Sequence, residues 1–231
     1  MIGTFPKHLQ RFEELLRKKT PFSLSRYGDG ELTIMKGVPL DLASKKEFTY
    51  DGNTNMQEEL LDSFTYQDDS YFVGIGCKCC VGDETYEEYK TLCQQPAENL
   101  TWANIFVNGN YNYFLHNIMP LFETFDEVVL VSPGTTERLP FKVSKHFKIG
   151  PDVWGKQYNL KEDLVTYTKD KEGVLVLLCA GPFANILCKT LHESNNRNTY
   201  LDLGSVFNVP LGIGANRGYL QGAATLHKIC I

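Results

Sequence analysis

Two strongly apolar segments most constrain what this chain can fold into. Val174–Cys179 and Glu127–Ser132 are dominated by Val and Leu, whereas a strand with one solvated face would alternate apolar and polar residues. Such segments alternate along the chain with helical patterns, an order that indicates a parallel sheet buried on both faces. The expected fold class is therefore α/β, with a Rossmann-like, mostly parallel sheet flanked by helices on both faces.

The same patterns assign the rest of the chain. Further strands are expected at 22–26, 71–77, 105–107, 145–150 and 199–203. Helices are expected at 5–19, 32–36, 56–64, 83–93, 97–102, 111–122, 160–167 and 182–192. Glycine or proline marks several of the boundaries, which is typical of turns between regular elements.

Length and charge exclude several classes of function. The chain has 231 residues, enough for one large domain with a buried core. Its 23 Lys and Arg residues against 28 Asp and Glu give a net charge of −5, so an extended basic surface for nucleic acid or anionic lipid is not expected. No apolar run approaches the roughly 18 residues of a membrane span, and no signal peptide is evident.

Cysteine usage bears on the compartment. There are seven cysteines, an odd number in a chain too large to depend on disulfides, and Cys179 and Cys188 lie in segments expected to be core. We therefore expect a soluble protein in the reducing cytoplasm. The stretch Cys77-Lys78-Cys79-Cys80 lacks a second Cys or His pair at zinc-site spacing, so by itself it does not predict a zinc site.

Parallel sheets bind ligands beyond the carboxyl ends of their strands, so the residues after each strand were compared. After the strand at 22–26 the chain reads Arg26-Tyr27-Gly28-Asp29-Gly30-Glu31. Two carboxylates one residue apart, with glycines beside them, can point into one small volume. Hard ions such as Mg²⁺ and Mn²⁺ use few carboxylate ligands and keep open positions for phosphate and water. A solvated turn would use the same residue types.

Three later corners offer further ligand groups. Gly181 and Pro182 follow an apolar strand and open a helix, whose N-terminal amides suit a phosphate or a ribose. Asp202 lies near the end of the strand at 199–203, where it would bind ribose, help to hold a metal or act as a base, or only cap a turn. Asn108 begins an Asn-Gly stretch that suits a hydroxyl-rich ligand, although it also forms common turns.

Taken in order, three of these stretches resemble one family. Phe-Ser-Leu-Ser-Arg-Tyr-Gly-Asp-Gly-Glu at 22–31 follows an N-terminal helix, and Val-Leu-Val-Leu-Leu-Cys-Ala-Gly-Pro at 174–182 and Tyr-Leu-Asp-Leu-Gly-Ser at 200–205 come later. The chain, over roughly residues 5–220, is similar to the GT-D-fold glycosyltransferases, a family first catalogued as a domain of unknown function. The resemblance implies one GT-D-type glycosyltransferase domain over 1–231.

The resemblance also implies roles for individual residues. Asp29 and Glu31 match the pair that organises Mn²⁺ or Mg²⁺ and the diphosphate, and Arg26 matches the arginine before it. Some members have histidine in place of Ser205, which leaves a base at that position in doubt. The residues expected to bind the nucleotide sugar are Arg26, Tyr27, Gly28, Gly30, Asn108, Gly181, Pro182, Gly204, Ser205, Arg217 and Tyr219.

The activity that this implies is a metal-dependent hexosyl or pentosyl transfer from a nucleotide sugar, a UDP-sugar first, to a sugar or glycan acceptor. If transfer inverts the sugar, Asp202 is the expected base; if it retains configuration, no dedicated base is needed. An S-adenosylmethionine-dependent methyltransferase would use Leu201-Asp202-Leu203-Gly204 for ribose, but that strand usually comes early in its fold. A non-catalytic glycan-binding domain, and a homo-oligomer, stay open.

Overall fold

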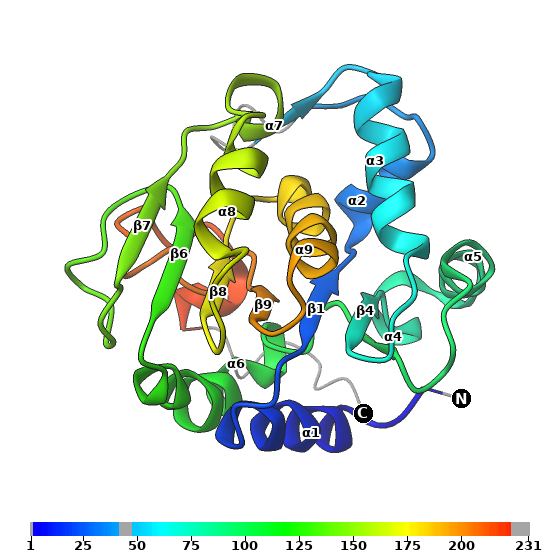
Figure 1. The fold of residues 1–231 in the computed structure, drawn as a ribbon. Coiled ribbons are helices and arrows are strands. Elements are labelled where there is room, and N and C mark those ends of the chain that lie inside the picture. Colours follow the sequence, from blue (N-terminus) through cyan, green and yellow to red (C-terminus); the bar gives the residue numbers. More distant parts are fainter. Residues whose placement is uncertain (1, 42–47, 223–231) are drawn as a thin grey trace.

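The computed structural model describes residues 2–41 and 48–222, whose main feature is a seven-stranded sheet in the order β5-β4-β1-β9-β8-β6-β7 (Figure 1). Every neighbouring pair in this sheet is parallel. The strands are β1 (Ser23–Arg26), β4 (Tyr71–Ile75), β5 (Leu100–Trp102), β6 (Val128–Ser132), β7 (Lys145–Lys148), β8 (Leu175–Leu178) and β9 (Thr199–Asp202). The expected α/β fold with a parallel sheet is confirmed.

Helices cover both faces of the sheet. The α-helices are α1 (Phe5–Arg17), α2 (Asp29–Met35), α3 (Thr54–Thr65), α4 (Lys78–Val81), α5 (Asp83–Cys93), α6 (Tyr111–Tyr113), α7 (Val153–Lys156), α8 (Leu160–Thr168) and α9 (Pro182–Ser194). Shorter helical turns are η2 (Asn108–Asn110), η3 (Phe114–Ile118), η4 (Met119–Thr124) and η5 (Gly218–Gln221), and β2 (Leu40–Asp41) pairs with β3 (Thr49–Tyr50) apart from the main sheet.

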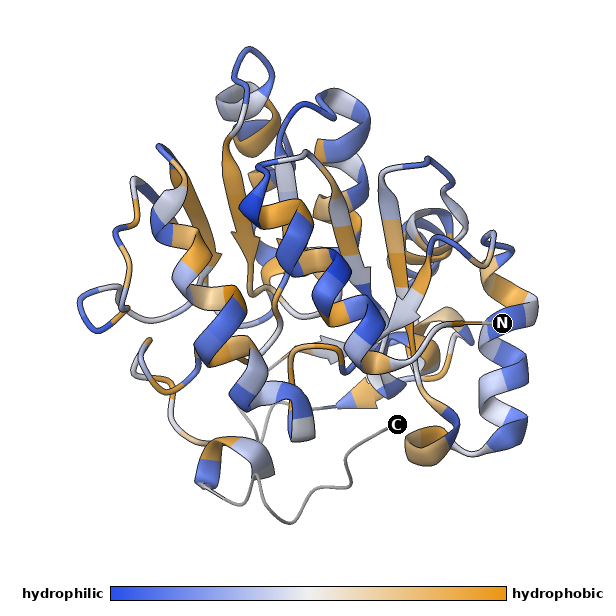
Figure 2. Cartoon of the chain, turned by 90° about the horizontal axis from the view of Figure 1, so that it is seen from below, coloured by the Kyte–Doolittle hydropathy of each residue, from blue (hydrophilic) through white to orange (hydrophobic). Residues whose placement is uncertain are grey.

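The alternation of side chains along the strands divides the core into two layers. On β8, Val176 and Leu178 pack into one apolar cluster with α2, α3, α5, α8 and α9, whereas Leu175 and Leu177 pack into a second with α1, η3 and η4. Both layers need apolar residues, because successive side chains of a strand point to opposite faces. Figure 2 shows the result, with hydrophobic colours along the strands and both colours on the surface helices. This two-sided burial explains the apolar runs in the sequence.

Two predicted elements are wrong. The segment predicted as a helix at 97–102 ends in β5 instead, which pairs with β4 from Val73↔Leu100 to Ile75↔Trp102. The segment predicted as a strand at 105–107 forms turns, in which Ile105 N–H donates to the Trp102 carbonyl at 3.1 Å. Ile105 and Phe106 are apolar because they are buried in the cluster around α1, and a three-residue edge strand carries too little pattern to be recognised.

A third predicted element differs in detail. The helix expected at 111–122 is divided into α6, the π-turn η3 and the 3₁₀-turn η4. Pro120 lies at the start of η4 and lacks the N–H that an uninterrupted helix requires. No helix of the described residues is long and apolar enough to cross a membrane.

A turn after β6 offers a test of the fold. Gly134 has φ of +82°, and a Cβ there would lie 2.1 Å from the Leu211 carbonyl oxygen. Gly173, before β8, has φ of +70° with no atom within 4 Å of such a Cβ. Both Gly→Ala changes incur the left-handed backbone cost of ~1 kcal/mol, and Gly134→Ala adds overpacking of ~1–3 kcal/mol. Urea unfolding should show a larger loss of unfolding free energy for Gly134→Ala than for Gly173→Ala. Equal losses would contradict the described packing.

Candidate active site

A buried ion pair joins the carboxyl ends of β1 and β9. Arg26 Nε donates to the Asp202 carbonyl at 2.6 Å, and its guanidinium lies 3.6 Å from Asp202 Oδ1. The same arginine donates from Nη1 to the Ala103 carbonyl at 2.9 Å. The two side chains are only 7% and 6% exposed. Because an unpaired buried charge costs several kcal/mol, each partner holds the other in place.

Asp202 uses both of its carboxylate oxygens within the protein. Oδ2 accepts the Arg26 backbone N–H at 3.1 Å, and Oδ1 accepts the Gly204 N–H at 3.0 Å. Burial raises the pKa of this carboxyl above its usual value, and the nearby Arg26 opposes that rise. The geometry supports a positioning role toward Arg26 better than the general-base role expected from the sequence.

The acidic turn after β1 opens α2. Gly28 is the N-cap, and its N–H donates to Glu31 Oε2 at 2.9 Å, so Glu31 closes a capping interaction. Tyr89 from α5 fixes the start of this turn, because its hydroxyl donates to the Gly28 carbonyl at 2.6 Å. Asp29 is exposed. Burial first, and then the charges of Asp202 and Asp29, raise the pKa of Glu31 to about 7.

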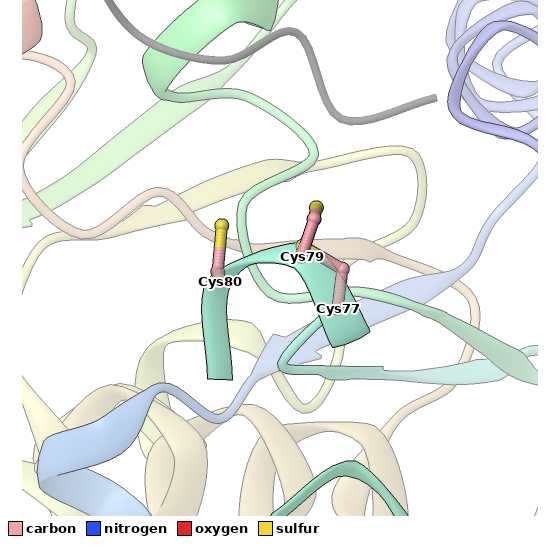
Figure 3. A group of neighbouring side chains, drawn as sticks. All are labelled: Cys77, Cys79 and Cys80. Atoms are coloured by element: carbon pink, nitrogen blue, oxygen red, sulfur yellow. The ribbon is translucent and has the colours of Figure 1, made fainter. Parts of the chain in front are cut away.

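The donors of this turn fit a hard divalent cation. The charges of Asp202 and Asp29 both raise the pKa of Glu31, and a cation beside Glu31 would offset this repulsion. The acidic turn does not bring three candidate ligand atoms within 4.8 Å of one another. Among the described residues, the group that does so consists of three cysteines (Figure 3). Asp29 and Glu31 would therefore supply two ligands, with the rest coming from phosphate and water, as Mg²⁺ prefers.

The N-terminus of α9 lies next to the acidic turn. Gly181 is exposed at its N-cap with φ of +56°, and Pro182 takes the first helical position. A Cβ on Gly181 would lie 3.3 Å from the Phe48 ring, and one on Gly30 would lie 3.7 Å from the same ring. Phe48 thus lies between the two glycine turns. In the first turn of α9, Pro182 has no N–H and the Ala184 N–H donates to the Gly181 carbonyl at 2.9 Å, so an anion there would meet the Phe183 N–H.

Asn185 is a site residue that sequence reasoning missed. Its Nδ2 donates to Ser25 Oγ at 2.9 Å and to the Arg26 carbonyl at 3.0 Å, and the side chain is fully buried. It therefore ties α9 to the end of β1. The available signal was an amide three residues after Pro182, within a stretch (182–188) that is otherwise apolar. Phe48 and Tyr89 carried none, because only the folded chain brings them to the turn.

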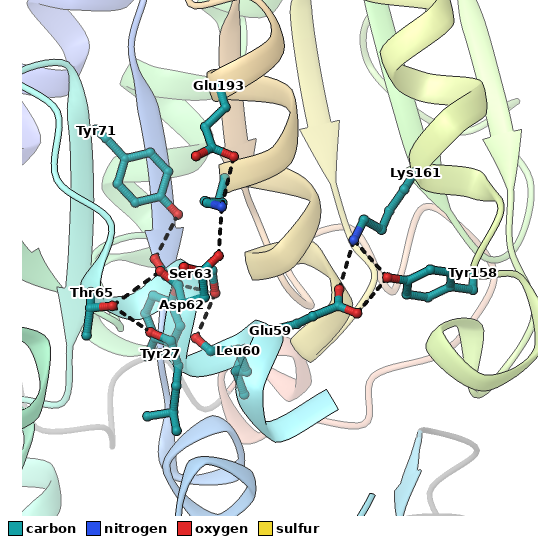
Figure 4. A network of polar contacts seen from close by, with 12 residues as sticks. Tyr27, Glu59, Leu60, Asp62, Ser63, Thr65, Tyr71, Tyr158, Lys161 and Glu193 are labelled. Atoms are coloured by element: carbon teal, nitrogen blue, oxygen red, sulfur yellow. Dashed lines mark hydrogen bonds and ion pairs between the residues drawn. The ribbon is translucent and has the colours of Figure 1, made fainter. Parts of the chain in front are cut away.

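One predicted binding residue lies in the core. The Tyr27 side chain is fully buried, and its hydroxyl donates to Ser63 Oγ at 2.9 Å, as Figure 4 shows. Its ring packs against Phe64 with centroids 4.5 Å apart. This side chain therefore fixes the strand end from within, and only the Tyr27 backbone remains near the site.

The other predicted residues lie beyond the carboxyl end of β9, and we call them the wall beyond β9. Ser205 Oγ and the Tyr219 hydroxyl are 2.7 Å apart, and burial raises the pKa of Tyr219 to about 12. Arg217 is partly buried, and its charge and that of Arg26 act on the same tyrosine. Asn108 begins η2, which packs on η5 beside Tyr219. The structure therefore brings all four residues to the site region.

A depression of about 610 Å³ lies at the opposite edge of the sheet. Pro21 and Gly173 in its lining precede β1 and β8, so it is at the amino ends of the strands. Its Arg197 is paired with Glu172. No pair of carboxylates lines it, so the chemistry favours the carboxyl edge.

The likeness of this chain to known proteins lies in its fold and not in its sequence. The sequence matches no family model and no curated protein. A solved structure described as the highly conserved domain of unknown function 1792, with a distinct glycosyltransferase fold, has a TM-score of 0.61 at 16% identity, over 86% of this chain and 77% of that chain. The fold is shared. The resemblance to the GT-D glycosyltransferases is thus confirmed for the fold.

A second solved structure agrees. It is described as a new glycosyltransferase of the same domain type from Streptococcus sanguinis, with a TM-score of 0.61 at 17% identity, over 86% of this chain and 80% of that chain. A selenomethionine form of domain 1792 has a TM-score of 0.58 at 16% identity. At such identities the likeness establishes the fold, and function must be argued from the site.

The raised pKa of Glu31 predicts a pH dependence of stability. The folded pKa of about 7 exceeds the ordinary 4.5, so the folded state binds more protons between these values. Wild type should therefore gain stability relative to Glu31→Gln as pH falls from about 7 to about 4.5, by ~1.4 kcal/mol per pKa unit. Urea unfolding in EDTA measures the difference; a flat or opposite trend would refute the assignment.

The close approach of Gly204 to Arg26 predicts a second effect. A Cβ at Gly204 would lie 2.6 Å from Arg26 Nη2, whereas one at Gly212 meets no atom within 4 Å, and both have positive φ. Gly204→Ala should therefore lower the unfolding free energy by ~1–3 kcal/mol more than Gly212→Ala, since the guanidinium must move from its partners. Chemical denaturation of both variants tests this. An equal loss of unfolding free energy in Gly212→Ala would show that Arg26 moves aside at no cost.

Proposed function

We propose that this protein is a metal-dependent glycosyltransferase that moves a hexosyl or pentosyl group from a nucleotide sugar, UDP-linked by preference, to a sugar or glycan acceptor. The observation that carries the proposal is the meeting of three features at one edge of the sheet. These are the Asp29–Glu31 turn, the α9 N-terminus at Gly181 and the buried Arg26–Asp202 pair. The shared glycosyltransferase fold supports the same reading.

In this proposal the acidic turn serves the diphosphate. Asp29 and Glu31 hold Mn²⁺ or Mg²⁺, which when bound neutralises the charge that builds on the departing nucleoside diphosphate. With its pKa near 7, Glu31 releases its proton readily when a cation approaches. The exposed Gly181 allows a phosphate to approach the start of α9, where the Phe183 N–H and the helix dipole favour an anion.

The remaining groups position the reacting parts. Transfer breaks the bond between the anomeric carbon and the diphosphate oxygen and forms one between that carbon and an acceptor oxygen, whose proton passes to the departing diphosphate. Arg26 places a fixed positive charge under the diphosphate, and Asp202 keeps that charge oriented. Ser205, Arg217 and Tyr219 offer hydroxyls and a guanidinium on the wall beyond β9.

We further propose that the reaction takes place in the cytoplasm. Cys93, Cys179 and Cys188 are buried in the apolar core as thiols, the form that reducing compartments maintain. A nucleic-acid partner is not part of the proposal, because the net charge is −5.

Removing the acidic pair tests the proposal. Asp29→Ala and Glu31→Ala should each reduce Mn²⁺-dependent hydrolysis of a UDP-sugar by ~100-fold or more, because the metal and diphosphate lose an anionic ligand. Released UDP is the readout in a screen of nucleotide sugars. Glu162→Ala, which removes an exposed carboxylate of α8, is the matched control and should keep full activity.

Full transfer in EDTA by a folded Asp29→Ala variant would contradict the proposal. So would a calorimetric titration that shows tight binding of S-adenosylmethionine and no binding of UDP, a result that would favour the methyltransferase alternative. Glycan binding that is indifferent to Mn²⁺, with no donor hydrolysis, would instead indicate a binding domain.

A further inference from the structure

Three cysteines gather at the carboxyl end of β4, apart from the acidic turn. Cys77 follows the strand, and Cys79 and Cys80 lie in α4. Their sulfur atoms all lie within 4.8 Å of one another, and Figure 3 shows the three side chains on one short segment. The Sγ atoms of Cys77 and Cys79 are 3.1 Å apart, well beyond the roughly 2.05 Å of a disulfide. Cys77 is buried, whereas Cys79 and Cys80 are exposed.

This spacing suits three ligands of one metal ion. Zinc–thiolate bonds of ~2.3 Å place the sulfurs of a tetrahedral site ~3.8 Å apart, and the observed sulfur separations, from 3.1 Å to at most 4.8 Å, bracket that value. Exposure of two thiols gives an ion access from solvent. The three sulfurs are therefore already close to the spacing that one ion requires.

A neighbouring amide already contacts the sulfurs. Asn104 Nδ2 lies 3.7 Å from Cys77 Sγ and 3.8 Å from Cys80 Sγ. An N–H directed at a thiolate stabilises its negative charge, as groups around metal ligands commonly do. Asn104 reaches the cluster from the segment after β5, so two strand ends contribute to it. The cluster thus has both ligands and an outer contact in place.

We propose that Cys77, Cys79 and Cys80 bind one thiophilic d¹⁰ cation, Zn²⁺ or Cu⁺, through three thiolates. Binding releases the three thiol protons to solvent. The site is chemically distinct from the acidic turn, because Mg²⁺ and Mn²⁺ prefer oxygen ligands and thiolates select softer ions. It does not depend on the proposed transferase activity.

The position of the cluster gives the ion a structural effect. Ala103, next to Asn104, donates its N–H to the Ile75 carbonyl at 2.8 Å and accepts from Arg26 with its own carbonyl. An ion that joins Cys77 to α4 would therefore stiffen the strand ends beside Arg26. The expected sign is a raised melting temperature of the full chain on loading, without any requirement for substrate.

The experiment uses the full chain, reduced with a phosphine and freed of metal. Chelator competition, run separately with Zn²⁺ and with Cu⁺, measures affinity and stoichiometry, and Co²⁺ reports thiolate ligation through its charge-transfer and visible d–d bands. The test variants are Cys79→Ser and Cys80→Ser, because these exposed positions tolerate serine. Cys93→Ser, which removes a buried cysteine outside the cluster, is the matched control.

We expect one equivalent of Zn²⁺ or Cu⁺, about 100-fold weaker binding in each cluster variant, and unchanged binding in the control. Asn104→Ala should weaken binding by about 10-fold or more. No stoichiometric binding of either ion overturns the proposal. So does binding that survives both cluster substitutions, or that falls equally in Cys93→Ser, since the ion would then lie elsewhere.

Discussion

The ion pair between Arg26 and Asp202 is the contact on which the rest of the site depends. It joins β1 to β9, the middle strand of the sheet, and the backbone N–H of the same arginine also donates to Asp202. Asn185 then holds the Arg26 carbonyl, which sets the direction in which the chain leaves the strand. The acidic turn therefore begins from a fixed point. Within that turn, Asp29 is exposed to solvent.

Two kinds of ligand chemistry follow from neighbouring strand ends. The end of β1 presents oxygen donors, and the end of β4 presents sulfur donors. Hard and soft ions are sorted by such donors rather than by cavity size. The two proposed metal sites would therefore select different ions and not compete with each other.

Much of the fold could be predicted because burial on both faces leaves a strong pattern in the sequence. β8 is apolar throughout and β6 is apolar up to its last residue, Ser132, so their segments were recognisable. β5 has only three residues and owes its form to pairing with β4. The Asp29–Glu31 turn was recognisable as a motif. The role of Asn185 was not, because its partners lie 159 and 160 residues away along the chain. Local patterns carry no information on such distant contacts.

The place of β1 in the sheet has a consequence for how the chain reaches its native state. β1 lies between β4 and β9, and its bonds with Asp202 span 176 residues. Contacts of such long sequence separation slow folding, since a large loop must close before they form. During synthesis the middle of the sheet stays incomplete until the last strand leaves the ribosome. The N-terminal half then carries an open strand edge that invites aggregation, so demand for chaperones should be greatest late in translation.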